Sequence, residues 1–268
     1  PVPDPILGEW SQNLDDIPPS LLRPTCCLNN IYRYGSEQLR QIRRAYYATI
    51  TQIDYNLGLL FARLREMNLL ENTWIIFTTD HGDMLGDHHL GAKSIFLEGS
   101  AHIPLIIRPP AASFDAKPNA GKRVDNLAML NDIMPTILSI AGIEIPDTVT
   151  GKNLLAGEMP ERTFIGHSES FFAVLQHPWK YLWCSEGGDE LLFNLDDDPG
   201  ETRNLAATAT EELQRLRGIL TEHLRQYAPE FLDSTDQLKA APVPPGRPWN
   251  TPRWPGFHSI DVHTDVLH

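Results

Sequence analysis

The chain has 268 residues, of which 41% are hydrophobic, and this size suits one large domain or one domain with a smaller companion. Its 22 basic and 35 acidic residues give a net charge of −13. This balance argues against a nucleic-acid-binding surface, which needs clustered Lys and Arg. No apolar run approaches the roughly 18 residues of a membrane-spanning helix, so we expect no membrane segment.

Three cysteines, Cys26, Cys27 and Cys184, are too few for a disulfide framework and lack the spacing of a zinc site. Their usage favours a reducing compartment such as the cytoplasm. The chain begins with Pro1 and carries neither an initiator Met nor a signal region. We therefore expect the natural N-terminus, and any targeting signal, to lie upstream.

A long amphipathic helix is predicted from Ser36 to about Met67, after an extended, proline-rich connection over residues 1–35. Its apolar stripe repeats every three or four residues and comprises Leu39, Ile42, Tyr46, Ile50, Ile53, Leu57, Leu60 and Leu64. At ~1.5 Å per residue the helix would span roughly 45 Å, the length of a sheet face. A strand at 74–79 follows, and helix followed by strand favours a parallel sheet.

The strand at 74–79 runs directly into the polar segment Asp80-His81-Gly82-Asp83. In open α/β sheets ligands gather outside the carboxyl ends of the strands, so a carboxylate beside an imidazole there is half of a metal site. Lys93 follows twelve residues after His81, in a loop long enough to be functional. We expect its ammonium to return to the same rim and clamp the oxygens of a charged tetrahedral group. The alternative is a turn-forming Asp80 and a solvated loop lysine.

Beyond the loop, residues 103–108 read as a strand, and Asp132 is placed to cap a helix that ends at Gly142. The sequence pattern changes near residue 155. Four short strand-like segments follow, and after them a helix is expected at 211–227. The spacing predicts an antiparallel meander with a packing helix. We thus divide the chain into 1–155, 156–227 and an arm at 228–268.

The arm at 228–268 contains seven prolines and four large aromatic residues. The prolines rule out a long helix, and the aromatics argue against pure disorder. We expect the arm to pack on this subunit or on a neighbouring copy. In the second case the protein would be a homo-oligomer.

Several segments together resemble the sulfatase family, within the alkaline-phosphatase-like superfamily, over residues 45–205. The matching residues are Tyr47-Ala48-Thr49-Ile50, Asp54, Ile76-Phe77-Thr78-Thr79-Asp80-His81-Gly82-Asp83, Gly86-Asp87-His88, Lys93, Glu98-Gly99-Ser100, Ile103-Pro104-Leu105-Ile106, Asp132-Ile133-Met134-Pro135-Thr136-Ile137-Leu138, Ala141-Gly142 and Leu192-Phe193-Asn194-Leu195-Asp196-Asp197-Asp198-Pro199-Gly200-Glu201-Thr202. The resemblance implies part of a mixed, mostly parallel α/β sheet with flanking helices, followed by a small antiparallel α+β subdomain.

The resemblance also implies roles for individual residues. Asp80 and His81 would bind a divalent metal ion, Ca²⁺ by analogy with most members and Mn²⁺ or Zn²⁺ by analogy with phosphonate-cleaving relatives. Lys93 would contact the sulfate oxygens and stabilise developing charge. His88 is a weaker candidate for contacting substrate, whereas Asp83 and Asp87 are expected to shape the loop, because further carboxylates would repel an anion.

The family nucleophile is not found in this chain. Sulfatases convert a Cys in a Cys-x-Pro-x-Arg segment to formylglycine, and the sequences around Cys26-Cys27 and Cys184 do not fit that pattern. We therefore expect the C-terminal portion of an enzyme that cleaves small sulfate monoesters, completed by its own N-terminal half and inactive alone. The alternatives are a phosphonate monoester or phosphodiester hydrolase and a catalytically inert fragment.

Overall fold

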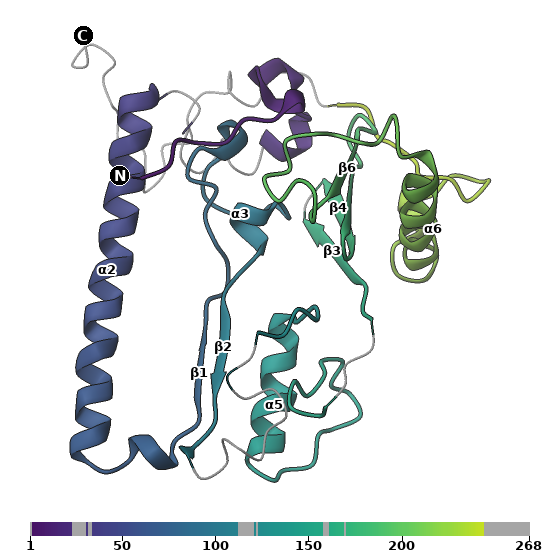
Figure 1. Ribbon diagram of the computed structural model, residues 1–268. Helices are drawn as coiled ribbons and strands as arrows, with labels where there is room; N and C mark the ends of the chain where they lie inside the picture. Colours follow the sequence, from purple (N-terminus) through teal and green to yellow (C-terminus); the bar gives the residue numbers. More distant parts are fainter. Residues whose placement is uncertain are drawn as a thin grey trace, which may run out of the picture. The chain divides into compact units, whose positions relative to one another are not determined.

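The computed structural model describes residues 2–22, 31, 34–111, 121, 123–157, 161–168 and 170–243 (Figure 1). Two compact units each combine segments that are distant in sequence. Unit 1 comprises 1–47, 81–102 and 164–268, and unit 2 comprises 48–80 and 103–163. This grouping differs from the predicted boundary at residue 155, because the loop 81–102 packs with the C-terminal sheet. No helix among the described residues is long and apolar enough to cross a membrane.

Unit 1 is built on a four-stranded antiparallel sheet in the order β3-β4-β5-β6. The strands are β3 (Phe164–Ser168), β4 (Phe171–Gln176), β5 (Trp179–Cys184) and β6 (Glu190–Asn194). Each strand pairs with the next along the chain, with Phe172 opposite Trp183 and Tyr181 opposite Leu192. The predicted meander is therefore confirmed, with strand ends within two residues of the expected ones.

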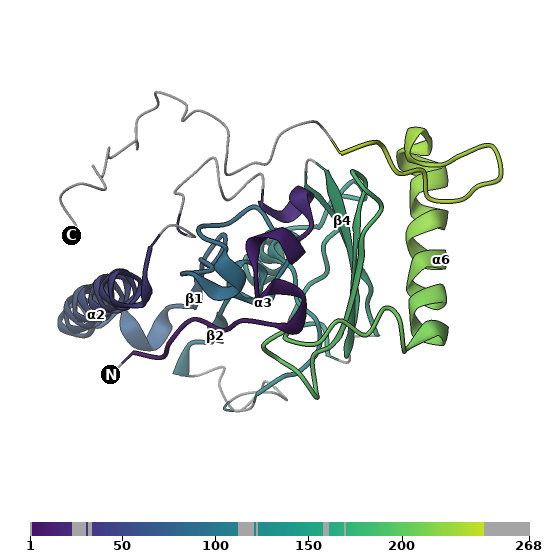
Figure 2. The ribbon, with the colours of Figure 1, turned by 90° about the horizontal axis from the view of Figure 1, so that it is seen from above.

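Alternate residues of this sheet enter two different cores. Phe172, Val174 and Trp183 pack on one face against helix α6 (Thr210–Tyr227), which buries Leu213, Leu216, Leu220 and Leu224. Phe171, Leu182 and Phe193 point to the other face, where Met84, Leu90, Ile95 and Leu97 of the loop 81–102 cover them. Figure 2 shows the sheet between α6 and the segment that carries helix α3 (Glu98–Ala101). The sheet thus forms the floor beneath the loop that carries Lys93.

The N-terminal segment belongs to the same core. Trp10, Ile17 and Leu21 are buried beside Met84 and Phe193. Two short 3-10 turns, η1 (Glu9–Ser11) and η2 (Leu14–Asp16), place Trp10 and Ile17, and Leu21 lies in a helical turn at 19–22. The expectation of an extended connection before residue 36 was therefore wrong for residues 9–22, which form short helical turns and whose apolar residues are too irregularly spaced to show a periodic signal.

Helix α2 (Ser36–Glu66) begins and ends as predicted, and β1 (Ile75–Thr78) follows it. β1 pairs antiparallel with β2 (Leu105–Arg108), with Ile75 opposite Arg108. The predicted mostly parallel sheet is not confirmed, since every ladder among the described residues is antiparallel. The segment between β1 and β2 forms the loop of unit 1, with the short η5 (Asp87–His89) and the four-residue α3, and it supplies no long helix of the kind that joins parallel strands.

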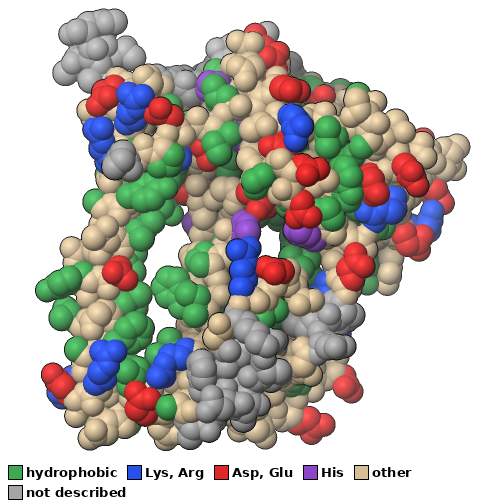
Figure 3. All heavy atoms as spheres, viewed as in Figure 1, with side chains coloured by type: hydrophobic (Ala, Val, Ile, Leu, Met, Phe, Trp, Pro, Cys, Tyr) green, Lys and Arg blue, Asp and Glu red, His purple; other side chains and the backbone are tan. Residues whose placement is uncertain are grey.

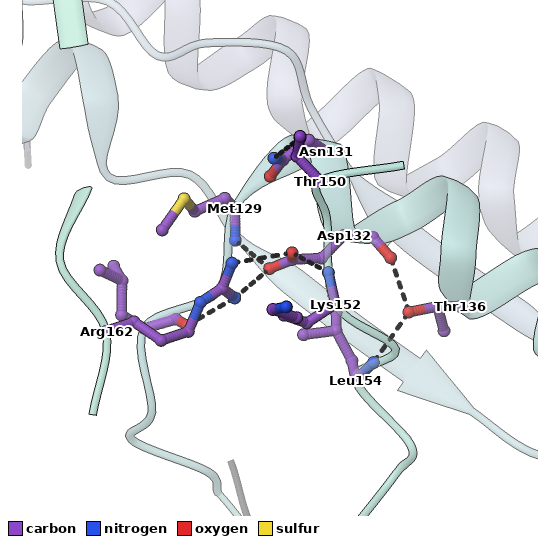
Figure 4. A network of polar contacts seen from close by, with 9 residues as sticks. Met129, Asn131, Asp132, Thr136, Thr150, Lys152, Leu154 and Arg162 are labelled. Atoms are coloured by element: carbon purple, nitrogen blue, oxygen red, sulfur yellow. Dashed lines mark hydrogen bonds and ion pairs between the residues drawn. The ribbon is translucent and has the colours of Figure 1, made fainter. Parts of the chain in front are cut away.

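Helix α5 (Ile133–Ile140) starts after Asp132, as expected, but the Asp132 side chain is not a simple cap. Its carboxylate is fully buried and accepts the backbone N–H groups of Met129 and Lys152. The Arg162 guanidinium donates to both carboxylate oxygens, at 2.5 and 3.0 Å (Figure 4). A single carboxylate therefore ties three separate stretches of unit 2 together.

Unit 2 exposes much of its apolar surface. Its buried apolar side chains, among the described residues, are few: Leu70, Pro109, Pro110 and Pro135. Ile50, Ile53 and Leu60 of the predicted α2 stripe are about half exposed, as are Ile106 of β2 and Met134 of α5. Figure 3 shows hydrophobic side chains along α2. The helix has the predicted amphipathic pattern, but its apolar stripe is at most partly covered in the described part of the chain. Tyr46, Ile50, Ile53 and Leu60 are exposed, and the other four residues are half-buried.

The start of the predicted arm packs on this chain. Phe231, in the turn η7 (Pro229–Phe231), lies 4.9 Å from the Phe172 ring and 6.3 Å from the Trp183 ring, measured between centroids. Residues 244–268 lie outside the described residues, so the predicted contact with a neighbouring copy stays a prediction.

Candidate active site

Asp80 and His81 follow β1 as the sequence predicts. Asp80 is exposed, and its Oδ1 accepts the Thr79 hydroxyl at 3.3 Å. His81 begins the loop of unit 1 and is half-buried. The strand thus delivers a carboxylate and an imidazole to the same turn.

The His81 ring has a defined tautomer. Its Nδ1 lies 2.7 Å from the Gly82 carbonyl oxygen, which can only accept, so Nδ1 carries the proton. The lone pair on Nε2 accepts a hydrogen bond from Lys93 Nζ at 2.7 Å. A backbone carbonyl that holds one imidazole nitrogen is the usual support of a metal-binding histidine. Nε2 already accepts a hydrogen bond from the Lys93 ammonium. This nitrogen is therefore an electron-pair donor of the kind that binds a metal ion.

Lys93 and His81 are brought together by a tightly folded loop. Asp83 Oδ1 accepts the backbone N–H groups of Leu85 and Ala92, and the Met84 N–H donates to the Ala92 carbonyl. Asp83 therefore shapes the loop, as expected. So does Asp87, which accepts from the Ile6 backbone and from Arg43.

The same loop stores backbone strain. Five residues other than glycine adopt left-handed φ angles, a conformation that is unfavourable for side chains with a Cβ. They are Leu85, His88, His89, Ala92 and Ser94. Such strain persists only where surrounding contacts over-determine the conformation, so the loop is held in a fixed shape around Lys93.

His88 packs inside unit 1. Its side chain is buried and stacks on Trp10 with ring centroids 4.7 Å apart. Nδ1 lies 2.9 Å from the Ser11 hydroxyl, and Nε2 lies 3.1 Å from the Gly200 carbonyl. Both ring nitrogens are used inside the protein, so the geometry lends no support to the predicted substrate contact. Trp10 and Ser11, which hold the ring, carry no local sequence signal.

Gly82 sits where no other residue fits. Its N–H donates to the Ser100 carbonyl at 2.8 Å, and a Cβ at this position would lie 2.2 Å from the Gly99 carbonyl oxygen. Helix α3 therefore backs directly onto the residue that follows His81. Sequence reasoning treated residues 98–100 only as part of a family match.

A buried charge cluster below α3 was also missed. Lys180 of β5 reaches Glu98 and Glu201 through the sheet face that the loop covers. No periodic or motif signal links these three residues, because their contacts span up to 103 positions of sequence. His102, just after α3, donates from Nδ1 to Glu98 Oε2 at 2.6 Å.

In the part of the chain that the structure describes, no three His, Cys, Asp or Glu side chains gather closely enough to hold a metal ion. Cys184 is buried and free, and burial raises the pKa of its thiol to about 12. It is therefore not placed as a nucleophile. Cys26 and Cys27 lie outside the described residues.

Comparison with known proteins gives consistent matches. The Sulfatase family model matches residues 18–143. An arylsulfatase of Clostridium perfringens is 35% identical over 253 residues, which is 90% of this chain and 51% of that protein. Arylsulfatase K of Canis lupus familiaris is 32% identical, over 70% of this chain and 38% of that protein. The chain thus spans about half the length, or less, of these curated relatives.

Solved structures agree with this match. A 2-O GAG sulfatase shares the fold at a TM-score of 0.72 and 23% identity, over 96% of this chain and 58% of that one. A phosphonate monoester hydrolase of Agrobacterium radiobacter aligns at a TM-score of 0.59 and 29% identity, over 78% of this chain and 47% of that one. A third structure, solved with its substrate D-glucosamine-2-N,6-O-disulfate, aligns at a TM-score of 0.62 and 25% identity, over 75% of this chain and 43% of that one.

Proposed function

Because the chain belongs to the sulfatase family, we propose that it is the C-terminal portion of a hydrolase that cleaves sulfate monoesters. The observation that carries the proposal is the 2.7 Å contact between Lys93 Nζ and His81 Nε2, next to Asp80 in the chain. It brings together an ammonium group and the imidazole that we propose as a metal ligand. A sulfate ester is anionic, and a site of this kind attracts its oxygens.

Asp80 and His81 would hold the divalent ion of the family, with further ligands from residues outside this chain. Such an ion, Ca²⁺ by family analogy, supplies charge neutralisation for an anionic ester. His81 keeps Nδ1 protonated on the Gly82 carbonyl and therefore presents Nε2 as a neutral donor. Lys93, once displaced from Nε2, presents its ammonium to a sulfate oxygen. Losing one such donor commonly lowers the rate by roughly 10²–10³.

The proposal also requires an N-terminal half. The relatives are about twice as long as this chain or longer, and unit 2 leaves its apolar surfaces uncovered. A further polypeptide segment that packs on α2, β1–β2 and α5 would bury Ile50, Ile106 and Met134 and stabilise the unit. That segment would also bring the remaining metal ligands and the formylglycine nucleophile, so residues 1–268 alone should not turn over substrate.

A phosphonate monoester hydrolase is the second candidate. The observation that favours it is the Agrobacterium radiobacter enzyme, whose printed name carries this activity and whose identity of 29% exceeds that of the 2-O GAG sulfatase. A nitrogen ligand such as His81 accepts Mn²⁺ or Zn²⁺ as well as Ca²⁺, so the described residues suit both chemistries.

A substrate panel tests the assignment. It is measured on a complete polypeptide, in which this chain follows the proposed N-terminal segment that carries the nucleophile. We expect an aryl sulfate to be hydrolysed faster than an aryl phosphonate or a phosphodiester. Lys93→Ala should lower turnover by about 10²–10³ and leave metal content, measured by elemental analysis, unchanged. Lys239→Ala, at an exposed lysine far along the chain, is the matched control and should behave as wild type.

Equal loss of turnover and metal in Lys93→Ala would assign the lysine a structural role. Faster cleavage of the phosphonate would favour the second candidate.

A further inference from the structure

Three charged side chains are buried together beneath the loop 81–102. Lys180 is 3% exposed, and its Nζ donates to Glu98 Oε1 at 2.5 Å and to Glu201 Oε1 at 2.8 Å. Glu201 is 2% exposed. Removing charges from water is unfavourable unless each is paired, so the three groups depend on one another.

The charges of the cluster follow from its contacts. Burial opposes charge on Lys180, but Glu201 and Glu98 outweigh it and raise the pKa of the ammonium. Burial also opposes ionisation of Glu98, yet hydrogen bonds from His102 and Lys180 lower its pKa to about 2. At Glu201 burial outweighs the attraction of Lys180 and raises the pKa. Lys180 thus stays cationic and Glu98 anionic at neutral pH.

A chain of hydrogen bonds leads from this cluster to the candidate site. Glu201 Oε2 accepts the backbone N–H of Glu98 at 2.7 Å and so fixes the first residue of α3. One turn later the Ser100 carbonyl accepts the Gly82 N–H, and the Gly82 carbonyl in turn accepts His81 Nδ1. Every link joins residues of unit 1.

The turn at 200–201 is tied to the loop a second time. The Gly200 carbonyl accepts from His88, and the Glu201 carbonyl accepts from Trp10 Nε1 at 2.7 Å. Glu201 itself holds a left-handed φ of 54°, an unfavourable conformation for a residue with a side chain. A strained backbone held by its carbonyl and by both carboxylate oxygens is a fixed anchor and not a mobile loop.

We propose that Lys180, Glu98 and Glu201 form a positioning cluster that fixes Gly82 through α3 and thereby sets the contact between His81 and Lys93. The catalytic consequence rests on the proposed function, whereas the effect on the backbone does not. The three residues touch no reacting atom. Their role is to hold the imidazole in one orientation.

Hydrogen exchange followed by mass spectrometry on the whole 268-residue chain tests the cluster. Lys180→Met keeps the length of the side chain and removes its charge. We expect amides of residues 81–102 to exchange about tenfold faster or more, equivalent to a local opening free energy lower by about 1.4 kcal/mol. Glu98→Gln is a milder variant that should also accelerate amide exchange in residues 81–102. It provides the test if Lys180→Met does not fold.

The matched control is Arg217→Met. Arg217 of α6 pairs with Glu190 of β6 at 2.6 Å, on the opposite face of the same sheet, where both side chains are half-buried. This variant should accelerate exchange in 210–227 and leave 81–102 at the wild-type rate. Unchanged exchange of 81–102 in both cluster variants, or equal acceleration in 81–102 and 210–227, would overturn the proposal. The measurement uses no substrate or metal, so failure of the proposed sulfatase activity cannot produce either result.

Discussion

Two histidines seven positions apart show how far neighbours decide the role of a residue. His81 presents one nitrogen to Lys93, whereas His88 lies under Trp10 with both nitrogens occupied. Sequence patterns single out both, because each is a polar residue in a glycine-rich loop. The difference comes from Trp10, Ser11 and Gly200, which reach His88 from more than 75 residues away in sequence.

The environment of His88 predicts a pH dependence of stability. Burial lowers its pKa below 6.5, and this outweighs the opposing pull of Asp87, Gly200 and Asp198. The ring is then neutral in the folded protein, while the unfolded chain binds a proton near pH 6.5. The stability contributed is therefore fully present above pH 6.5 and is lost as pH falls towards the folded-state pKa.

Urea unfolding at pH 7.5 and 5.5 measures this effect. We expect the wild-type chain to lose more unfolding free energy between the two values than His88→Gln does. His89→Gln, in the same loop but half-buried, should keep the wild-type difference. A His88→Gln variant with the wild-type pH difference would show that this ring is not responsible.

At the scale of elements, periodicity identifies what local sequence dictates. The helix at 36–66, the four-stranded meander and helix α6 lie where the apolar spacing predicts them. Periodicity does not identify what an element packs against. It thus misses that the loop 81–102 covers one face of the C-terminal sheet, and that residues 9–22 share that core. β1 and β2 also pair antiparallel at the two ends of the loop 81–102, which the helix-then-strand order did not indicate.

The buried pair between Arg162 and Asp132 should matter more than any surface pair of unit 2. Arg162→Met leaves the fully buried Asp132 carboxylate with backbone donors alone, which should lower the unfolding free energy by about 3–5 kcal/mol. Arg123→Met removes an exposed pair with Asp125 and should change it by less than about 1 kcal/mol. Similar losses in the two variants, measured by urea unfolding, would contradict a structural role for Asp132.

At the scale of the molecule, the two units differ in how complete they are. Unit 1 has a sheet with a core on each face, whereas the described part of unit 2 buries Leu70 and a few prolines and leaves many apolar side chains exposed. The sequence likewise predicts an incomplete set of catalytic residues, because no segment fits the pattern of the family nucleophile. The exposed part of the α2 stripe supports the proposal of a further N-terminal segment, which would cover it.

The central claim is that Asp80, His81 and Lys93 are one half of a sulfate-ester site whose other half lies upstream. The most direct test is sulfate release from an aryl sulfate, compared between residues 1–268 alone and the complete polypeptide. We predict no release above background from the chain alone and sustained turnover from the complete protein, abolished by His81→Ala. Turnover by residues 1–268 alone, or full activity of His81→Ala in the complete protein, would contradict the account.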